Sequence, residues 1–200
     1  MKRAATRTGP EKTRRARTRH WQADSFTHLR APVPVPVPAP VLAPDFEAKI
    51  VAPEGLPAAL AALPRPLVFT NGCFDILHRG HVTLLAQARA LGASMIVALN
   101  SDASIKRLGK GDDRPVNTLA DRLAVIAALE SVSLVTWFEE DTPIERILEC
   151  LPDVLVKGGD WPTEKIVGHT EVAAWGGRTV SIPFIHQKST TALLEKIRRL

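Results

Sequence analysis

The chain has 200 residues, of which 45% are hydrophobic and 24% are charged, and its formal net charge is +5. This length and composition allow one ordinary domain with a substantial core, plus an appendage. No apolar run approaches the roughly 18 residues that a membrane span needs, and two cysteines cannot build a disulfide scaffold. We therefore expect a cytoplasmic protein with no membrane partner.

The positive charge is concentrated at the start of the chain. Residues 1–30 hold 9 Lys and Arg against 2 Asp and Glu, which leaves 17 against 19 for the remainder. The remainder is therefore mildly acidic, and we expect no nucleic-acid partner, since such a partner needs a basic face on the folded domain.

Residues 32–44 read PVPVPVPAPVLAP, and prolines at this density favour an extended chain. We expect a disordered basic and Pro-rich tail over 1–45 and a folded domain over 46–200. The tail could tether the protein to an anionic surface, have no role, or precede the true start of the protein, and these alternatives stay open.

From residue 46 onward, apolar runs of strand type alternate with segments of helical period. In chain order, the predicted strands are 67–72, 94–102, 131–138, 153–161 and 178–184, and the predicted helices are 81–92, 118–130, 142–151, 163–177 and 189–200, with a polar loop at 103–117. The strands are continuous apolar runs, which is typical of a parallel sheet covered on both faces. The predicted fold is therefore a doubly wound α/β domain with a five-stranded parallel, Rossmann-like sheet.

Three polar clusters follow strand ends, where ligands bind in such sheets. They are TNGCFDILHRGH at 70–81, KGGDW at 157–161 and HQKSTT at 186–191. Several familiar motifs are absent from the sequence: the GxxxxGK[ST] phosphate loop, the GxGxxG fingerprint after the first strand, the HExxH zinc motif and the deaminase pattern. The clusters must therefore be interpreted from their own residues.

His78 and His81 are the strongest candidates for chemistry in these clusters. If Gly80 opens the helix, side chains three residues apart share one face and can point at one ligand. That ligand would lie near a helix N-terminus, where free N–H groups and the helix dipole favour an anion, and Gly80 would let it approach the backbone. Two imidazole donors at such a place suit a phosphoryl group. No third His or Cys stands at ligand spacing, so we expect no metal site at this pair.

The full pattern G-x-F-D-x-x-H-x-G-H after an apolar strand resembles the HxGH signature of the nucleotidyltransferase superfamily of cytidylyl- and adenylyltransferases. Residues 66–199 resemble most closely its branch that adenylylates D-glycero-β-D-manno-heptose 1-phosphate, through TNGCFDILHRGHVTLLAQAR, NSDAS, RPVN, FEEDTP, LVKGGDW and STT. The resemblance implies a stand-alone enzyme of ADP-heptose synthesis for the lipopolysaccharide core. It would transfer AMP from ATP, with Mg²⁺, to a sugar 1-phosphate and release pyrophosphate.

The resemblance also implies roles for individual positions. The implied catalytic residues are His78 and His81, which would contact the triphosphate. The implied nucleotide-binding positions are Thr70, Asn71, Gly72, Phe74, Gly80, Gly158, Asp160, Ser189, Thr190 and Thr191. The implied phosphate or substrate contacts are Asp75, Lys106, Arg114, Arg122 and Lys188.

The residues by themselves leave simpler roles open for some of these positions. Lys106 could be a solvated loop charge, Asp75 could brace the turn, and Arg122 could be a surface residue of its helix. Gly158 could only turn the chain, while Asp160 caps the next helix. Three further cations, Lys157, Lys165 and Arg178, receive no role.

The donor base and the acceptor are less constrained. Related cytidylyltransferases carry Arg and Gly in an RTxGIST pattern where this chain has Phe184 and Gln187, which argues against that branch. The alternatives that stay open are CTP as donor, another phosphorylated acceptor such as glycerol 3-phosphate, and a non-catalytic nucleotide- or RNA-binding protein. A homo-oligomer also stays open.

Overall fold

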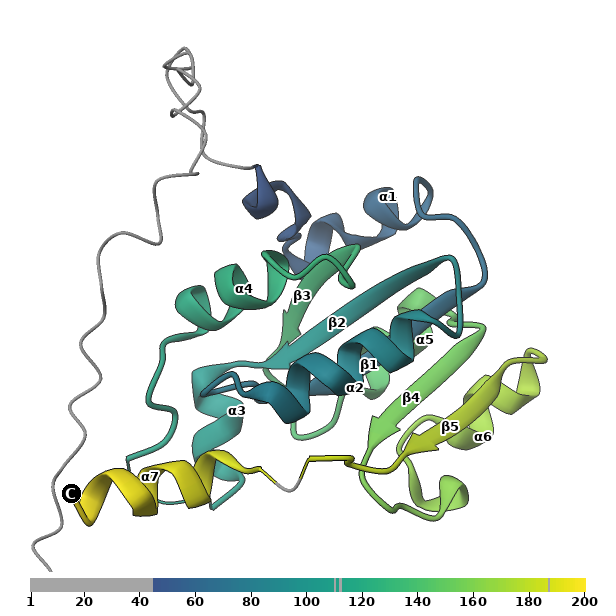
Figure 1. Ribbon diagram of the computed structural model, residues 1–200. Coiled ribbons are helices and arrows are strands. Elements are labelled where there is room, and N and C mark those ends of the chain that lie inside the picture. Colours follow the sequence, from purple (N-terminus) through teal and green to yellow (C-terminus); the bar gives the residue numbers. More distant parts are fainter. Residues whose placement is uncertain (1–44, 110, 112, 187) are drawn as a thin grey trace, which may run out of the picture. The chain divides into compact units, whose positions relative to one another are not determined.

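The structure is a computed structural model that describes residues 45–200 except 110, 112 and 187 (Figure 1). The tail expected over 1–45 lies, apart from Asp45, outside the described residues, and so does Gln187. Within the described part, no helix is long and apolar enough to cross a membrane.

Five parallel strands form one sheet in the order β3-β2-β1-β4-β5, which confirms the predicted doubly wound α/β fold (Figure 1). The strands are β1 (Leu67–Gly72), β2 (Ser94–Asn100), β3 (Leu134–Phe138), β4 (Val154–Gly158) and β5 (Arg178–Ile182). The chain moves outward from β1 through β2 to β3 and then returns to β4 on the other side of β1. The order of the strands therefore reverses between β1 and β4, and their carboxyl ends are where a ligand is expected in such a sheet.

Helices cover both faces of the sheet, and each face has its own core cluster. They are α1 (Leu56–Leu60), α2 (Arg79–Arg89), α3 (Asp102–Arg107), α4 (Leu119–Ala127), α5 (Ile144–Cys150), α6 (His169–Ala174) and α7 (Thr190–Arg198). The cluster beneath α2 and α4 contains Leu85 and Ile126, and we call it the first-face cluster. The cluster beneath α1, α5 and α6 contains Ile147, and we call it the second-face cluster. In β1, Val68 belongs to the first cluster and Phe69 to the second, as the alternation of side chains along a strand requires.

The residues before β1 add structure that the sequence pattern did not predict. Two short 3-10 helices, η2 (Phe46–Lys49) and η3 (Pro53–Gly55), precede α1. Phe46 and Ile50 pack against the first-face cluster, and Ile50 pairs with Val135 of β3. The folded structure is therefore already anchored at residue 46.

Two further predictions of secondary structure were wrong in detail. The polar loop expected at 103–117 begins with helix α3, because the hydroxyl of Ser101 caps that helix by accepting a hydrogen bond from the N–H of Ser104 at 3.1 Å. The helix expected at 163–177 is instead the 3-10 helix η4 (Thr163–Lys165) followed by α6. Gly168 separates the two with φ of +90°, and a helix cannot continue through that conformation.

Candidate active site

A cavity of about 400 Å³ lies at the carboxyl end of β1, between the segment that follows this strand and the start of α7. We call it the His pocket. Its lining residues are Cys73, Phe74, Asp75, His78, His81, Arg114, Phe184, Lys188, Ser189, Thr190 and Thr191. Three segments far apart in the sequence thus meet where the doubly wound fold is expected to bind its ligand.

The two histidines face each other at the start of α2. His78 is the N-cap residue and has an extended backbone, whereas His81 lies in the first turn. Their rings are stacked, with centroids 3.8 Å apart and 16° between the ring planes. Phe74 supports the pair, since its ring meets that of His81 edge to face at 5.2 Å. The Nδ1 atom of His81 is buried and has no hydrogen-bond partner among the described residues.

Both imidazoles are neutral near pH 7. Burial lowers the pKa of His81 to about 4, and the neighbouring His78 adds to the shift because two positive rings would repel each other. Burial also lowers the pKa of His78, with a smaller contribution from the positive charge of Lys188. Each ring can therefore offer one N–H donor and one acceptor, rather than a permanent charge.

Gly80 has a packing role that the sequence did not reveal. A Cβ atom at this position would lie 3.1 Å from the ring of His78 and 3.3 Å from the carbonyl oxygen of His186. Glycine therefore lets the chain before α7 pass close to the start of α2. This close approach brings the two helix N-termini to the same pocket.

The start of α7 supplies hydroxyl groups and a cation. Ser189 is the N-cap, and its hydroxyl accepts a hydrogen bond from the N–H of Ala192 at 3.1 Å. Thr190 is buried, Thr191 is exposed, and Lys188 stands beside them at the rim. Helix N-termini attract anions, so α2 and α7 with Lys188 make this pocket suitable for phosphate groups.

Asp75 lines the His pocket, but its carboxylate is occupied by the protein. It accepts hydrogen bonds from the Nε of Arg114 and, at 2.9 Å, from the backbone N–H groups of Val116 and Asn117. Burial disfavours the ionised carboxylate, but the N–H groups of Asn117 and Val116 and the Arg114 guanidinium outweigh it and lower the pKa of Asp75. These contacts fit the bracing role that the sequence left open, since they hold the RPVN loop against the His pocket.

Arg122 is buried in a similar network and does not line the His pocket. Its guanidinium donates to the carbonyl oxygen of Cys73 at 2.7 Å, to that of Asn117 at 3.2 Å and to the carboxylate of Asp102 at 2.7 Å. The side chain is 0% exposed. It is therefore not the surface residue that its helix position allowed, and it braces the loop that carries the histidines.

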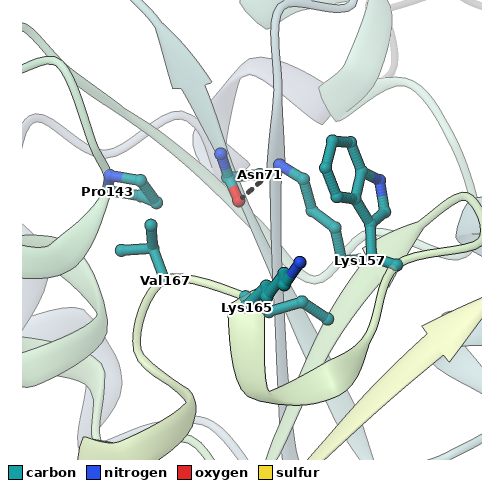
Figure 2. Close-up of a pocket in the computed structure, with 7 residues that line it drawn as sticks. Asn71, Pro143, Lys157, Lys165 and Val167 are labelled. Carbon is teal, nitrogen blue, oxygen red and sulfur yellow. Dashed lines mark hydrogen bonds between the residues drawn. The ribbon is translucent and has the colours of Figure 1, made fainter.

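The remaining predicted positions lie in different places. Thr70 is buried within β1, and Asn71 lines a second cavity (Figure 2). Gly158 ends β4, where a Cβ would clash with Leu84 at 2.4 Å. Asp160 lines a groove next to the His pocket together with Lys188 and Ser189, so the structure brings it close to α7. Lys106 is exposed on α3 and lines neither the His pocket nor that groove.

Sequence reasoning missed several residues at these cavities. Cys73 and Phe184 line the His pocket, although Cys73 was not among the predicted site residues and Phe184 was used only as evidence against CTP. Lys157 and Lys165 line the second cavity. Their shared positive charge was the available signal, but only the fold shows that they meet. In the described part of the chain, no group of three or more His, Cys, Asp or Glu residues could hold a metal ion.

A parallel α/β sheet with two helix N-termini, neutral histidines and hydroxyls at its switch point defines a nucleotide-binding protein of the doubly wound class. The comparison with known families is more specific. Residues 69–190 match the family model described as cytidylyltransferase-like. The chain belongs to this family and is a nucleotidyltransferase.

Among similar proteins, the D-beta-D-heptose 1-phosphate adenylyltransferase of Bordetella bronchiseptica is 58% identical over 156 residues, which cover 77% of this chain and 96% of that protein. Bifunctional protein HldE of Hahella chejuensis is 57% identical over 134 residues, and the match spans only 28% of its length. Among solved structures, a lipopolysaccharide core biosynthesis protein from Thermoplasma volcanium has a TM-score of 0.51 at 24% identity, covering 61% of this chain and 98% of that one. That likeness shows the shared fold.

Proposed function

We propose that this chain transfers AMP from ATP to D-glycero-β-D-manno-heptose 1-phosphate, giving ADP-heptose and pyrophosphate. The observation that carries the proposal is the meeting of His78 and His81 with the hydroxyl-rich start of α7 in one pocket. The choice of acceptor is supported by the 58% identity to the Bordetella adenylyltransferase, which extends over nearly the whole of that protein. A role in ADP-heptose synthesis for the lipopolysaccharide core follows from this choice.

In this mechanism the β- and γ-phosphates lie against the N-terminus of α7, with Ser189, Thr190 and Thr191, and the α-phosphate lies at the histidines. An oxygen of the acceptor's phosphate attacks the α-phosphorus and forms a new P–O bond. The bond between the α-phosphorus and its bridging oxygen to the β-phosphate breaks, and pyrophosphate leaves with that electron pair. The attacking oxygen is already ionised near pH 7, so no protein base is needed.

The histidines would act as hydrogen-bond donors to charge that develops on the α-phosphoryl group and on the leaving pyrophosphate. Their low pKa values keep them neutral before the nucleotide arrives. A neutral donor stabilises the developing charge without binding the ground-state triphosphate as tightly as a cation would. Catalysis then depends mainly on positioning and on this selective stabilisation.

Mg²⁺ would enter with ATP as part of the substrate. Its charge would reduce repulsion between the triphosphate and the approaching acceptor phosphate. Cys73 and Cys150 form no disulfide, which is consistent with the cytoplasm as the place of reaction.

Pyrophosphate release from the purified protein tests the proposal. ATP, Mg²⁺ and the heptose 1-phosphate should together give turnover, and leaving out any one of them should abolish it. CTP in place of ATP should be slower, and glycerol 3-phosphate in place of the heptose should be slower still, because groups that bind sugar hydroxyls would be left unpaired. If glycerol 3-phosphate with CTP is the best pair, the acceptor and the base are both wrong. If ATP binds but no pair gives turnover, the alternative of a non-catalytic nucleotide-binding protein is favoured.

A further inference from the structure

Phe74 has a backbone conformation that its side chain does not favour. Its φ is +45°, in the left-handed region, and in the described part of the chain only one other non-glycine residue has a positive φ. That residue, Leu151, is the C-cap of α5, and a left-handed residue commonly follows the end of a helix. Phe74 ends no helix, so its conformation is strained, and such strain persists only where the surrounding structure imposes it.

The two neighbours of Phe74 are held by hydrogen bonds from elsewhere in the chain. The carbonyl oxygen of Cys73 accepts a hydrogen bond from the guanidinium of Arg122 at 2.7 Å. The carbonyl oxygen of Asp75 accepts one from the side-chain amide of Asn117. The peptide unit before Phe74 and the residue after it are therefore both fixed, by α4 and by the loop that precedes α4.

The ring of Phe74 touches both the end of β1 and the start of α2. It belongs to the first-face cluster, and the residue is 6% exposed. A Cβ atom on Gly72 would lie 3.0 Å from the ring, so glycine at the end of β1 leaves the space that the ring occupies. The ring also meets that of His81 edge to face, with 68° between the planes.

His81 is therefore held between two rings. Its imidazole stacks on that of His78, with centroids 3.8 Å apart, and meets Phe74 at 5.2 Å. Functional histidines are commonly oriented by a hydrogen bond at one ring nitrogen. The Nδ1 of His81 is buried and accepts or donates no hydrogen bond among the described residues, so packing takes the place of that bond.

We propose that Phe74 is a positioning residue whose ring fixes the orientation of His81. Arg122 and Asn117 act on the reaction through Phe74, by holding its left-handed backbone. The proposal rests on the proposed function, since it takes His81 as the donor to the phosphoryl group. A further cavity of about 160 Å³ also borders Phe74, so the ring has space to move. The held backbone keeps the ring against His81 and preorganises the donor before ATP binds.

The variant Phe74→Leu removes the ring and keeps a buried apolar side chain. Phe138→Leu is the matched control, since Phe138 is 2% exposed, belongs to the second-face cluster and lies on β3, which β2 separates from β1. We expect kcat to fall about 10- to 100-fold in Phe74→Leu, as it does when a catalytic group is misplaced. The KM for ATP should stay within about threefold, because the loss concerns the transition state.

The control should lose stability without losing activity. Phe138→Leu should lower the urea midpoint by an amount similar to Phe74→Leu, with kcat within about twofold of the parent. Phe74→Tyr keeps the ring and should recover most of the activity. Phe74→Met, whose flexible side chain fills irregular space, should show the same fall in kcat and replaces Phe74→Leu if that variant does not fold.

The titration of His81 gives a readout that needs no turnover. Burial lowers the pKa of this ring to about 4, and a ring that is free to move toward water should titrate closer to its ordinary value of 6.5. NMR titration of the histidine ring protons should therefore show a higher pKa for His81 in Phe74→Leu and an unchanged one in Phe138→Leu. Comparison with the variant His81→Asn assigns the signal.

Glycine and alanine at position 74 separate the backbone from the ring. A left-handed backbone suits glycine and strains alanine, so Phe74→Gly should have a higher urea midpoint than Phe74→Ala, the reverse of the usual order. Both variants lack the ring, and both should lose at least as much kcat as Phe74→Leu.

A kcat of Phe74→Leu within twofold of the parent, or a fall that Phe138→Leu shares, would overturn the inference while leaving the proposed function intact. An unchanged pKa of His81 in Phe74→Leu would overturn it as well. A higher urea midpoint for Phe74→Ala than for Phe74→Gly would show that no strain is held at this position. If the parent protein shows no turnover, the proposed function fails, and the pKa of His81 in Phe74→Leu still decides whether Phe74 positions that ring.

Discussion

Substitution of Asp75 by Asn should destabilise the fold strongly, because its carboxylate holds the RPVN loop against the His pocket. The side chain is 0% exposed and accepts hydrogen bonds from Arg114, Val116 and Asn117. Asn keeps the shape but places an NH₂ group against donors and leaves the buried guanidinium without its counter-charge. Removing one partner of a buried ion pair costs about 3–5 kcal/mol of stability. Because Asn keeps one acceptor oxygen, we expect a loss near the lower end of this range.

The same substitution at Asp141 is the matched control. Asp141 pairs with Arg107 at 2.7 Å, but its side chain is 77% exposed. Exposed pairs contribute at most about 1 kcal/mol, so Asp141→Asn should shift the urea midpoint by less than about 0.5 M, whereas Asp75→Asn should lower it by about 1–2 M. Urea unfolding followed by circular dichroism measures both.

The pH dependence gives an independent check on Asp75. Its folded-state pKa is lowered, so the stability that it contributes is present above the ordinary Asp pKa of about 3.9 and is lost as the pH falls through the folded-state value. The difference in urea midpoint between the parent protein and Asp75→Asn should therefore become smaller at low pH. If Asp75→Asn and Asp141→Asn shift the midpoint equally at pH 7, the bracing role is refuted.

Four other predictions concern the histidines, the cysteines and the tail. Alanine in place of His78 or His81 should lower kcat by a factor of about 10²–10³, as the loss of one preorganised hydrogen-bond donor does. The urea midpoint should change little. Activity within twofold of the parent in both variants would contradict the mechanism. The pKa of His81 is about 4 in the folded protein, against an ordinary value of 6.5. The free energy of unfolding should therefore fall as the pH drops from 6.5 to 4, by less than about 3 kcal/mol. In the variant His81→Asn, unfolding measured across this pH range should show a smaller fall. Iodoacetamide should label Cys73, which lines the His pocket, and ATP should slow this reaction. The reagent should spare Cys150, because burial raises the pKa of that thiol to about 12. Mass spectrometry of the peptides shows which cysteine is labelled. Removal of residues 1–45 should leave kcat and both KM values within about twofold, and loss of activity on removal would show that the tail contributes to the domain.

The strands were predictable because β1 to β4 are apolar and largely buried, and only β5, at the edge of the sheet, is half-buried. The strand predicted at 67–72 coincides with Leu67–Gly72, since an apolar run bounded by a proline and a turn has few other structures available. Helix ends were less predictable, because they depend on single contacts. Ser101 starts α3 through one hydroxyl bond in a polar stretch, and Gly168 interrupts the helix expected at 163–177 through its own backbone conformation.

The candidate site was predictable where one segment holds the information, and less so where segments meet. The spacing of His78 and His81 indicated a shared ligand from twelve consecutive residues. The partners of Asp75 lie 39 to 42 positions away, and Asn71 and Lys157 are 86 positions apart. Only the pairing of strands brings such residues together, and for that reason the bracing network and the second cavity could not be predicted from local pattern.

The central claim is that an oxygen of the acceptor's phosphate attacks the α-phosphorus of ATP. Heptose 1-phosphate labelled with ¹⁸O in its phosphate oxygens, reacted with unlabelled ATP and Mg²⁺, tests it by mass spectrometry of the products. Attack at the α-phosphorus predicts that all of the ¹⁸O stays in ADP-heptose, with one labelled oxygen bridging the two phosphorus atoms, and that pyrophosphate carries none. Label in pyrophosphate, or AMP released in place of pyrophosphate, would contradict it.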